Sequence, residues 1–489
     1  MTEFPHPEYK RLVLKECFDD AKRFFLDAML KIDLAHLVML TEQGIITKPE
    51  AKTLLEAIKS ISKEEILKTE YDGSFEDLFY LIQQKIKQKV KSDVAGKLHT
   101  ARSRNDIDVT LYRIKLREFT LKLIDSVLGL RSVLLELSSR YSDSPMPAYT
   151  HTQPAQPTTI GHFLLAMIEA LRRDTHRFFD SYRNLNMCPL GAAAITTSGF
   201  PINRFRTAEL LGFDEPVRNS YGAIASVDYF TQLVSTSAIL MINIGKFVYE
   251  FLLMSMQEFG VIWLPDGFVQ GSSIMPQKRN PVALEHTRAI SSRALGELTG
   301  VMIAVHNTPF GDINDVEDDL QPLIFTGLHN AYRATDLLRA TLENAKFNTE
   351  KLRHRAEENF ITVTELADEL VRKFNLSFKD SHQVVSRAVK LSLEINKPID
   401  AEILKVSSRE VLGKEIVMAE EEIRQILSAE NFIQIRKAYG GTSSEQVKSS
   451  IEDEKRLLSK DKSKLYQIKE KLLKADEMLE NEVIALLQS

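Results

Sequence analysis

The sequence predicts an all-α protein built around a central bundle of long helices. Apolar residues recur at steps of three and four over most of the 489 residues, which is the spacing of a helix face. Three segments stay apolar for longer than an ordinary surface helix would. No alternating strand pattern extends beyond a few residues, and no repeat of 20–50 residues is found.

The first segment, residues 1–106, is predicted to be an N-terminal helical domain that ends in a polar loop. The first long helix follows this loop. From Leu116 its apolar face consists of Phe119, Leu123, Val127, Leu130, Leu134 and Leu137. The start of this helix therefore marks the beginning of the central domain, which we place at residues 107–362.

Two further long helices belong to this central domain. One begins near Asp228 and continues past Phe259, and its apolar residues occupy most of the circumference. The other begins after Pro281, a residue that suits a first helical turn, and runs to about Val305. Because each helix is too apolar for a single buried face, we expect a bundle that also packs against other subunits.

Residues 363–489 are predicted to form a C-terminal helical domain of shorter segments. Residues 440–443, Gly-Gly-Thr-Ser, indicate a turn followed by a helix N-cap. The tail from Ser449 is highly charged with sparse Leu and Ile residues. We expect an exposed or partner-packing helix there, and we favour a solvated helix over a coiled-coil role.

The composition excludes several classes of protein. A net charge of −5 and a pI near 6.2 argue against a nucleic-acid-binding protein. Two cysteines cannot form a disulfide framework and fit a reducing compartment. The N-terminus is polar, and the most apolar stretch, 238–254, is interrupted by Asn243, Lys246 and Glu250. We therefore expect a cytoplasmic protein that binds neither a membrane nor nucleic acid.

The most informative segment is residues 271–281, Gly-Ser-Ser-Ile-Met-Pro-Gln-Lys-Arg-Asn-Pro. Gly at the start and two Pro residues give a loop that can move and yet has few conformations to lose. Ser272 or Ser273 could act as nucleophile or base, with Lys278 and Asn280 holding an anion. Taken alone, the segment predicts a polar surface loop.

A second polar cluster is Lys-Leu-His-Thr-Ala-Arg-Ser-Arg-Asn-Asp at residues 97–106. Two arginines, an asparagine and hydroxyl groups next to a helix N-terminus suit a dicarboxylate, through charge-assisted hydrogen bonds and the helix dipole. A capped helix start with surface arginines is the alternative.

A third cluster is Tyr-Thr-His-Thr-Gln-Pro-Ala-Gln-Pro at residues 149–157. His151 is a candidate proton carrier because the ordinary pKa of histidine lies near neutrality, and Thr150 and Gln153 could bind a substrate or orient the imidazole. We expect structural roles for His99, His162, His286 and His306.

These three clusters, in this order, resemble the signatures of the fumarase/aspartase superfamily. Gln277 and the Arg-Ser-Arg-Asn run at residues 102–105 resemble its argininosuccinate lyase branch. Shorter matches occur at residues 189–194, 200–202, 207–213 and 219–220, so the resemblance covers about residues 30–450.

The resemblance implies a three-domain subunit with a central long-helix bundle, a 20-helix core in the homotetramer, and active sites that are each shared by three chains. It implies β-elimination of an N-substituted aspartate to fumarate and an amine, which is arginine if the substrate is argininosuccinate. No cofactor or metal is implied, and no metal-ligand spacing is found in the sequence.

The resemblance also assigns roles to individual residues. Ser272 would be the base, His151 would help to protonate the leaving nitrogen, and Lys278 would stabilise the charged carboxylate. The remaining positions implied to bind substrate are Ser103, Arg104, Asn105, Thr150, Gln153, Ser273, Met275 and Asn280.

The sequence departs from the family where the amine should bind. Phe79 replaces a histidine, and Asp312, Glu317 and Leu320 replace Tyr, Gln and Lys. The opening Trp-Gly-Gly-Arg-Phe motif is missing. These changes favour a leaving group rich in cationic amine, or argininosuccinate bound in a different register. The alternatives are another N-substituted aspartate, such as ethylenediamine disuccinate, and a non-catalytic crystallin-like structural protein. The presence together of Ser272, Lys278, Asn280 and His151 argues against the structural role.

Overall fold

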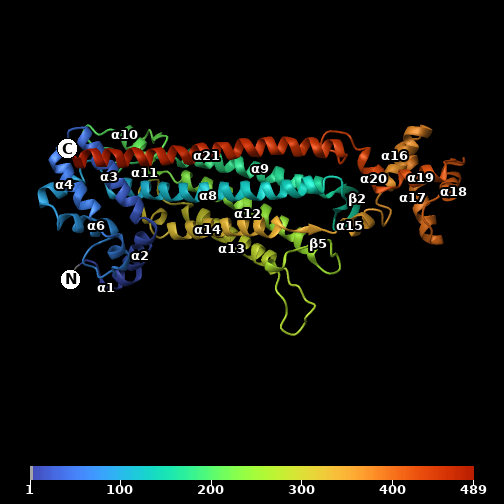
Figure 1. Cartoon of the computed structure of the whole chain (residues 1–489), viewed down its shortest axis with the longest axis horizontal. Helices are drawn as coiled ribbons and strands as arrows, with labels where there is room; N and C mark the ends of the chain where they lie inside the picture. The colour runs from blue at the N-terminus through green and yellow to red at the C-terminus, as the bar shows by residue number, and fades with distance from the viewer. Residues whose placement is uncertain (1–3, 489) are drawn as a thin grey trace.

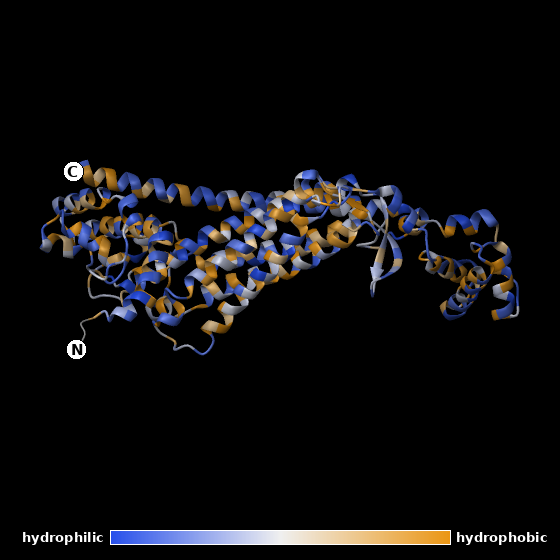
Figure 2. Ribbon diagram, turned by 90° about the horizontal axis from the view of Figure 1, so that it is seen from below, coloured by the Kyte–Doolittle hydropathy of each residue, from blue (hydrophilic) through white to orange (hydrophobic). Residues whose placement is uncertain are grey.

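The computed structural model describes residues 4–488 as an elongated, almost entirely helical molecule (Figure 1). Its centre is a bundle of five long helices. These are α8 (Arg104–Arg140), α9 (Ile160–Leu185), α12 (Asp228–Ser255), α13 (Val282–Val305) and α14 (Gln321–Glu343). The three expected long helices correspond to α8, α12 and α13, and Figure 2 shows apolar residues along much of the bundle.

Shorter helices surround the N-terminal end of α8. They are α1 (Pro7–Tyr9), α2 (Lys15–Phe24), α3 (Leu26–Glu42), α4 (Lys48–Lys59), α5 (Lys63–Lys68), α6 (Leu78–Lys87) and α7 (Ser92–Lys97), with a π-helical turn at Lys10–Leu14. The helices α10 (Arg204–Leu210) and α11 (Ser220–Ala225) precede α12, and single 3₁₀ turns occur at Asp266–Phe268 and Asn314–Val316. One continuous hydrophobic core joins this end to the bundle.

Three small two-stranded sheets accompany the helices. An antiparallel hairpin pairs β1 (Pro145–Thr150) with β2 (Gln153–Thr159), and this hairpin was not expected from the sequence. The other two sheets pair β3 (Met187–Cys188) with β4 (Glu215–Pro216) and β5 (Ile262–Trp263) with β6 (Lys346–Phe347). The prolines within β1 and β2 account for the weak strand signal, because proline cannot donate a ladder hydrogen bond.

A small unit follows the bundle at the end opposite to the chain termini (Figure 1). It contains α16 (Val363–Phe374), α17 (Phe378–Ile395), α18 (Ala401–Leu412), α19 (Glu420–Ile426) and α20 (Ala429–Gln434). The preceding helix α15 (Thr349–Arg355) packs against β1, and its Leu352 belongs to the core of the bundle. Residues 366–426 form a hydrophobic core of their own, separate from that of the bundle.

The last helix, α21 (Ser444–Gln488), is not the solvated helix that the charged tail predicted. The expected turn before it is present, and the Ser443 hydroxyl accepts the Gln446 N–H at 3.4 Å. One side of the helix is buried in the core of the bundle, through residues that include Val447, Ile451, Leu458 and Leu465. The steps of four and seven between these residues place them on one face, which the surrounding charges conceal in the sequence.

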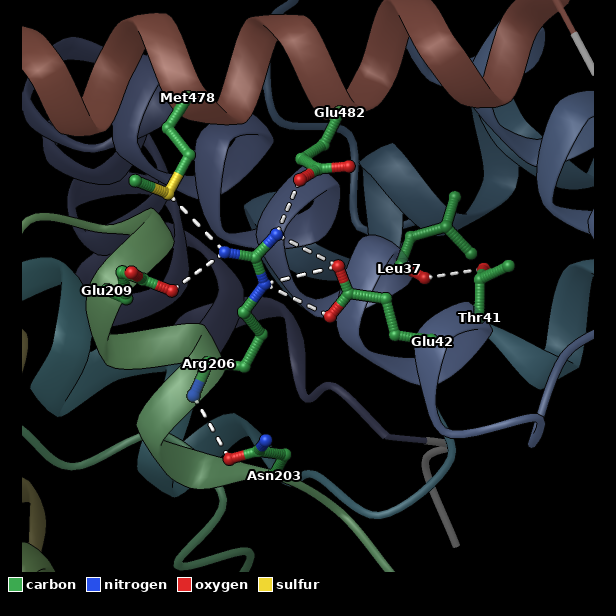
Figure 3. Close-up of polar contacts among 8 residues, drawn as sticks. All are labelled: Leu37, Thr41, Glu42, Asn203, Arg206, Glu209, Met478 and Glu482. Carbon is green, nitrogen blue, oxygen red and sulfur yellow. Dashed lines mark hydrogen bonds and ion pairs between the residues drawn. The ribbon is translucent and has the colours of Figure 1, made fainter.

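Arg206 anchors the far end of α21 (Figure 3). Its guanidinium donates to Glu482 of α21 at 2.6 Å, to Glu42 of α3 at 2.9 Å and to Glu209 of α10 at 2.7 Å. The guanidinium thus joins three helices that are distant in sequence. Arg206 therefore connects the C-terminal end of α21 to the N-terminal helices.

Among the described residues, one helical stretch, 220–255, is long and apolar enough to cross a membrane by length and composition alone. Core helices of soluble proteins have the same property. Most of this stretch is α12, which packs against α9, α13 and α14 within the chain.

Candidate active site

The first polar cluster lies at the start of α8. Ser103 is the N-cap, and its N–H donates to the carboxylate of Asp106 at 2.8 Å in a capping box. Arg104 and Asn105 occupy the first helical turn, and the Ser103 hydroxyl donates to the Asn105 side-chain oxygen at 2.6 Å. The structure thus places these three residues side by side.

Arg104 faces two acidic residues, Glu76 and Asp77, that directly precede helix α6. Its Nη1 donates to Glu76 at 2.9 Å and to Asp77 at 2.7 Å, and its guanidinium lies 5.4 Å from the centre of the Tyr80 ring. These contacts position the side chain at the rim of a cleft. A substrate carboxylate would have to compete with Glu76 and Asp77 for the guanidinium.

The cleft beside Arg104 and Asn105 has a volume of about 320 Å³ and is strongly acidic. Asn105 donates to the carboxylate of Asp312, and the buried Tyr112 hydroxyl donates to Asp318 at 3.0 Å. The acidic residues that line the cleft are Glu76, Asp77, Asp108, Asp312, Glu317, Asp318 and Asp319. The cleft is therefore suited to a cation next to the predicted carboxylate-binding residues.

Three carboxyl groups in this cleft, those of Asp108, Glu317 and Asp318, have pKa values raised chiefly by burial. Burial, with the hydrogen bond and charge of Asp312, raises the pKa of Glu317 to about 8. Burial also raises the pKa of Asp108, and the neighbouring carboxylates of Asp318 and Asp77 add to the effect. The interaction with Asp312 therefore favours the protonated form of Glu317.

Glu317→Gln is expected to stabilise the protein, and by more above pH 8 than at about pH 5. A carboxyl group whose pKa is raised on folding binds a proton as the chain folds. Folding stability is therefore lost as pH rises from the ordinary glutamate pKa to about 8. Glutamine stays neutral and avoids this loss. Thermal unfolding across this range tests the prediction, with Glu136→Gln on the exposed face of α8 as control, and a pH-independent difference would contradict it.

The four departures from the family divide into two groups in the structure. Asp312 and Glu317 line the cleft. Phe79 and Leu320 are buried, with 6% and 5% of their surface exposed, and Phe79 packs against His99 at 5.1 Å between ring centres. The sequence could not distinguish these groups, because burial depends on neighbours that are distant in the chain.

The second cluster forms the tip of the β1–β2 hairpin. Thr150 pairs with Gln153, and His151 and Thr152 fill the two-residue turn with φ angles of 51° and 64°. Such turns favour Gly and Asn, and a β-branched residue with positive φ costs about 1–3 kcal/mol. The imidazole of His151 is exposed at this tip. Strained backbone at a solvent-facing histidine is typical of a functional residue.

His162 makes structural contacts of the kind that we expected. His162 contacts the Thr158 hydroxyl at 2.9 Å and the Gly440 carbonyl oxygen at 3.1 Å, and it thereby joins α9 to the turn before α21. Burial lowers the pKa of His99 to about 4, with the charges of Arg102 and Arg104 contributing. His99 is therefore neutral at physiological pH.

The third cluster, residues 271–281, is an exposed loop that projects from the bundle between β5 and α13 (Figure 1). Paired backbone hydrogen bonds of 2.9 Å between Gln270 and Asn280 close its base. Arg279 fastens this base by donating to Asp266 at 2.6 Å and to the Leu264 carbonyl at 2.9 Å. The loop thus has a firm base and an exposed tip.

Ser272 lies within this loop and accepts two backbone hydrogen bonds. The N–H groups of Ile274 and Met275 approach its Oγ at 3.3 and 3.1 Å. Donors of this kind stabilise negative charge on the oxygen, which a serine base requires. Ser273, Met275 and Lys278 are exposed on the same loop, and Asn280 is at its base.

One chain does not bring the three clusters together. The 37 residues of α8, about 55 Å long, separate Arg104 and Asn105 from the hairpin that carries His151. The 24 residues of α13, about 36 Å long, separate the loop 271–281 from the 312–319 segment beside Asn105. The first cluster thus lies at one end of the bundle, and the other two lie toward the opposite end.

The helical bundle and the three polar clusters define this protein as a fumarase/aspartase-superfamily lyase. A family described as Lyase matches residues 29–296, and one described as Argininosuccinate lyase C-terminal matches residues 360–434. The chain belongs to the argininosuccinate lyase family of carbon–nitrogen lyases.

Several relatives support this assignment. Argininosuccinate lyase 2 of Agrobacterium fabrum is 41% identical over 92% of this chain and 90% of its own length. Argininosuccinate lyase of Methanocaldococcus jannaschii is 35% identical over 93% of both chains. Among solved structures, EDDS lyase in complex with formate superposes with a TM-score of 0.88 at 31% identity, covering 100% of this chain and 97% of that one. The family and the all-α fold predicted from the sequence are thereby confirmed.

Proposed function

We propose that this protein cleaves argininosuccinate by β-elimination and releases fumarate and arginine. The observation that carries the proposal is the retention of Ser272, His151 and the Arg104–Asn105 pair in a chain of this family. A non-catalytic structural role would leave no reason to keep the strained turn at His151 or the two donors on Ser272.

In the proposed reaction, Ser272 removes the proton from the carbon β to the leaving nitrogen. The electron pair forms the carbon–carbon double bond of fumarate as the carbon–nitrogen bond breaks. Negative charge develops on the neighbouring carboxylate, where Lys278 and Asn280 stabilise it in a site closed to water. Arg104, Asn105 and Thr150 hold the substrate carboxylates, with Ser103, Gln153, Ser273 and Met275 lining the site, and His151 protonates the leaving nitrogen, directly or through water.

We further propose that the active protein is a homotetramer with active sites shared between chains. The lengths of α8 and α13 support this, because they separate the clusters in any one chain. Large apolar side chains are exposed on the bundle helices, which a second copy would cover; they include Ile239, Ile242, Tyr249, Met302 and Ile303. The proposal includes a cytoplasmic location and no cofactor.

Shared sites predict complementation between two inactive variants. Ser272→Ala and Arg104→Ala proteins, each inactive alone, are expected to regain activity when they are unfolded together and reassembled. Random assembly would leave about a quarter of the sites with both residues intact, if the two residues come from different chains. Fumarate release by the mixture measures this. If the reassembled mixture is as inactive as the two variants alone, Ser272 and Arg104 of each site come from one chain, and the proposal of shared sites is wrong.

A second candidate substrate is another N-substituted aspartate, such as ethylenediamine disuccinate. The similarity to EDDS lyase and the acidic cleft at Asp312 and Glu317 favour it. Both substrates release an amine product, and arginine itself carries two cationic groups. The acidic residues of the cleft therefore do not distinguish argininosuccinate from ethylenediamine disuccinate as the substrate.

Ultraviolet absorbance of fumarate distinguishes the candidates when purified protein is offered each substrate in turn. Turnover of argininosuccinate supports the leading proposal and means that Asp312 and Glu317 hold the same substrate differently. Turnover of ethylenediamine disuccinate alone means that these residues have changed the specificity for the amine. A protein that releases fumarate from none of the N-substituted aspartates tested would overturn the proposed function.

A further inference from the structure

Asp106, two residues after Arg104, connects the start of α8 to a second segment of the chain. Its side chain is completely buried. One carboxylate oxygen accepts the Ser103 N–H at 2.8 Å, and the other accepts the N–H groups of Gly191 and Ala193 at 2.7 and 2.9 Å. A single carboxylate thus holds two segments that are more than 80 residues apart in the sequence.

The segment that Asp106 holds is a loop with unusual backbone geometry. Gly191, Ala193 and Thr197 have φ angles of 88°, 52° and 64°. The Thr197 N–H donates to the Ala192 carbonyl at 2.8 Å, which closes a tight turn, and Thr196 and Thr197 are exposed. Glycine adopts a positive φ without cost, whereas at Ala193 and Thr197 such a conformation costs free energy and persists only where the surrounding structure enforces it. The hydrogen bond from the Ala193 N–H to Asp106 helps to hold the conformation at Ala193.

A separate set of contacts fixes the chain before Ser103. Arg102 and Asp33 form a buried ion pair at 2.7 Å, and His36 contacts the Thr100 carbonyl oxygen at 2.9 Å. The path of residues 100–102 is therefore set without Asp106. What Asp106 adds is the link from residues 103–105 to residues 191–193.

We propose that Asp106 is a positioning residue of the lyase, which sets the loop 191–198 as a wall of the substrate site beside Arg104 and Asn105. The proposal rests on the proposed function of those two residues. An ordinary helix cap is the competing explanation. Capping requires only the oxygen that faces Ser103, whereas the other oxygen accepts two hydrogen bonds from the loop.

The test compares Asp106→Asn with Asp174→Asn. Asp174 is also fully buried, on α9, where it accepts from Arg177 and Asn243 at 2.8 Å, outside the proposed site. An asparagine at position 106 has one acceptor oxygen, and its NH₂ group faces backbone donors, so one of the two links is lost. The readouts are amide hydrogen exchange of residues 189–198 and the steady-state kinetics of fumarate release.

For Asp106→Asn we expect at least tenfold faster exchange at Gly191 and Ala193, and at least a tenfold fall in kcat/KM that is carried mainly by KM. Asp174→Asn should show neither change. Unchanged exchange in Asp106→Asn, or equal kinetic losses in both variants, would overturn the proposal. If Asp106→Asn does not fold, amide hydrogen exchange is measured in the wild-type protein instead. Fast exchange at Gly191 and Ala193 would show that their N–H groups are not held by Asp106 and would overturn the proposal.

The two failures are distinguishable. A wild-type protein that turns over no N-substituted aspartate overturns the proposed function and, with it, the catalytic part of this inference. An active wild-type protein whose Asp106→Asn variant keeps its KM and its exchange pattern overturns only the role of Asp106.

Discussion

Ser272→Ala is expected to lower kcat for fumarate release by about 10³-fold or more, because it removes the proposed base. The backbone donors from Ile274 and Met275 that face its oxygen would remain without an acceptor. Substrate binding should change little, since Arg104, Asn105 and Lys278 are retained. Steady-state kinetics give the loss in kcat, and calorimetric titration with substrate gives the affinity.

Ser292→Ala is the matched control for this substitution. Ser292 is an exposed serine on α13 whose hydroxyl donates to the Arg288 carbonyl at 3.1 Å, away from the signature loop. This variant should keep wild-type activity. Near-full activity of Ser272→Ala would show that another group is the base, and weakened binding with unchanged kcat would make Ser272 a binding residue instead.

Arg131→Ala is expected to destabilise the protein by about 3–5 kcal/mol. Arg131 is fully buried in the middle of α8, where it donates to Asp461 of α21 at 2.6 Å and to Thr175 of α9 at 3.2 Å. Its guanidinium also lies 3.5 Å from Glu454. Alanine would leave two carboxylates of α21 in the interior with fewer cationic partners. Urea unfolding followed by circular dichroism measures the loss.

A quadruple variant, Arg131→Met and Arg172→Met with Glu454→Met and Asp461→Leu, controls for the loss of charge, because Arg172 also pairs with Glu454 at 2.5 Å. Replacing a buried ionic cluster by apolar residues of similar volume is often neutral, so this variant should recover most of the stability. Lys31→Ala, which removes an exposed ion pair with Asp476 at the other end of α21, should cost less than about 1 kcal/mol. Equal losses in Arg131→Ala and Lys31→Ala would contradict a structural role for the buried cluster.

The helices and the polar clusters could be predicted from the sequence because their signals are local. The apolar steps from Leu116 identify α8, and Pro281 directly precedes α13. The loop 271–281 and the segment 97–106 carry their chemistry within about ten residues each. The assignment to this family of lyases followed from these segments.

The sequence-based prediction that α21 is a solvated helix was wrong, and the reason is physical. Charged residues such as Glu454 and Asp461 look solvated in a sequence, yet here they pair with Arg131 and Arg172 in the interior. Pairing removes the penalty that would otherwise keep such groups in water. Which charges are paired depends on the partner helix, and the sequence of α21 does not contain that helix.

The sequence by itself determined the helical class, the family and the identity of the candidate catalytic groups, since each depends on neighbours a few positions away. Only the tertiary structure decided where these groups lie. It placed Arg104 and His151 at opposite ends of α8, put His151 on a strained turn, and directed Asp312 into the cleft. Distance, strain and burial arise from contacts between segments far apart in the chain, and local patterns carry no information about those contacts.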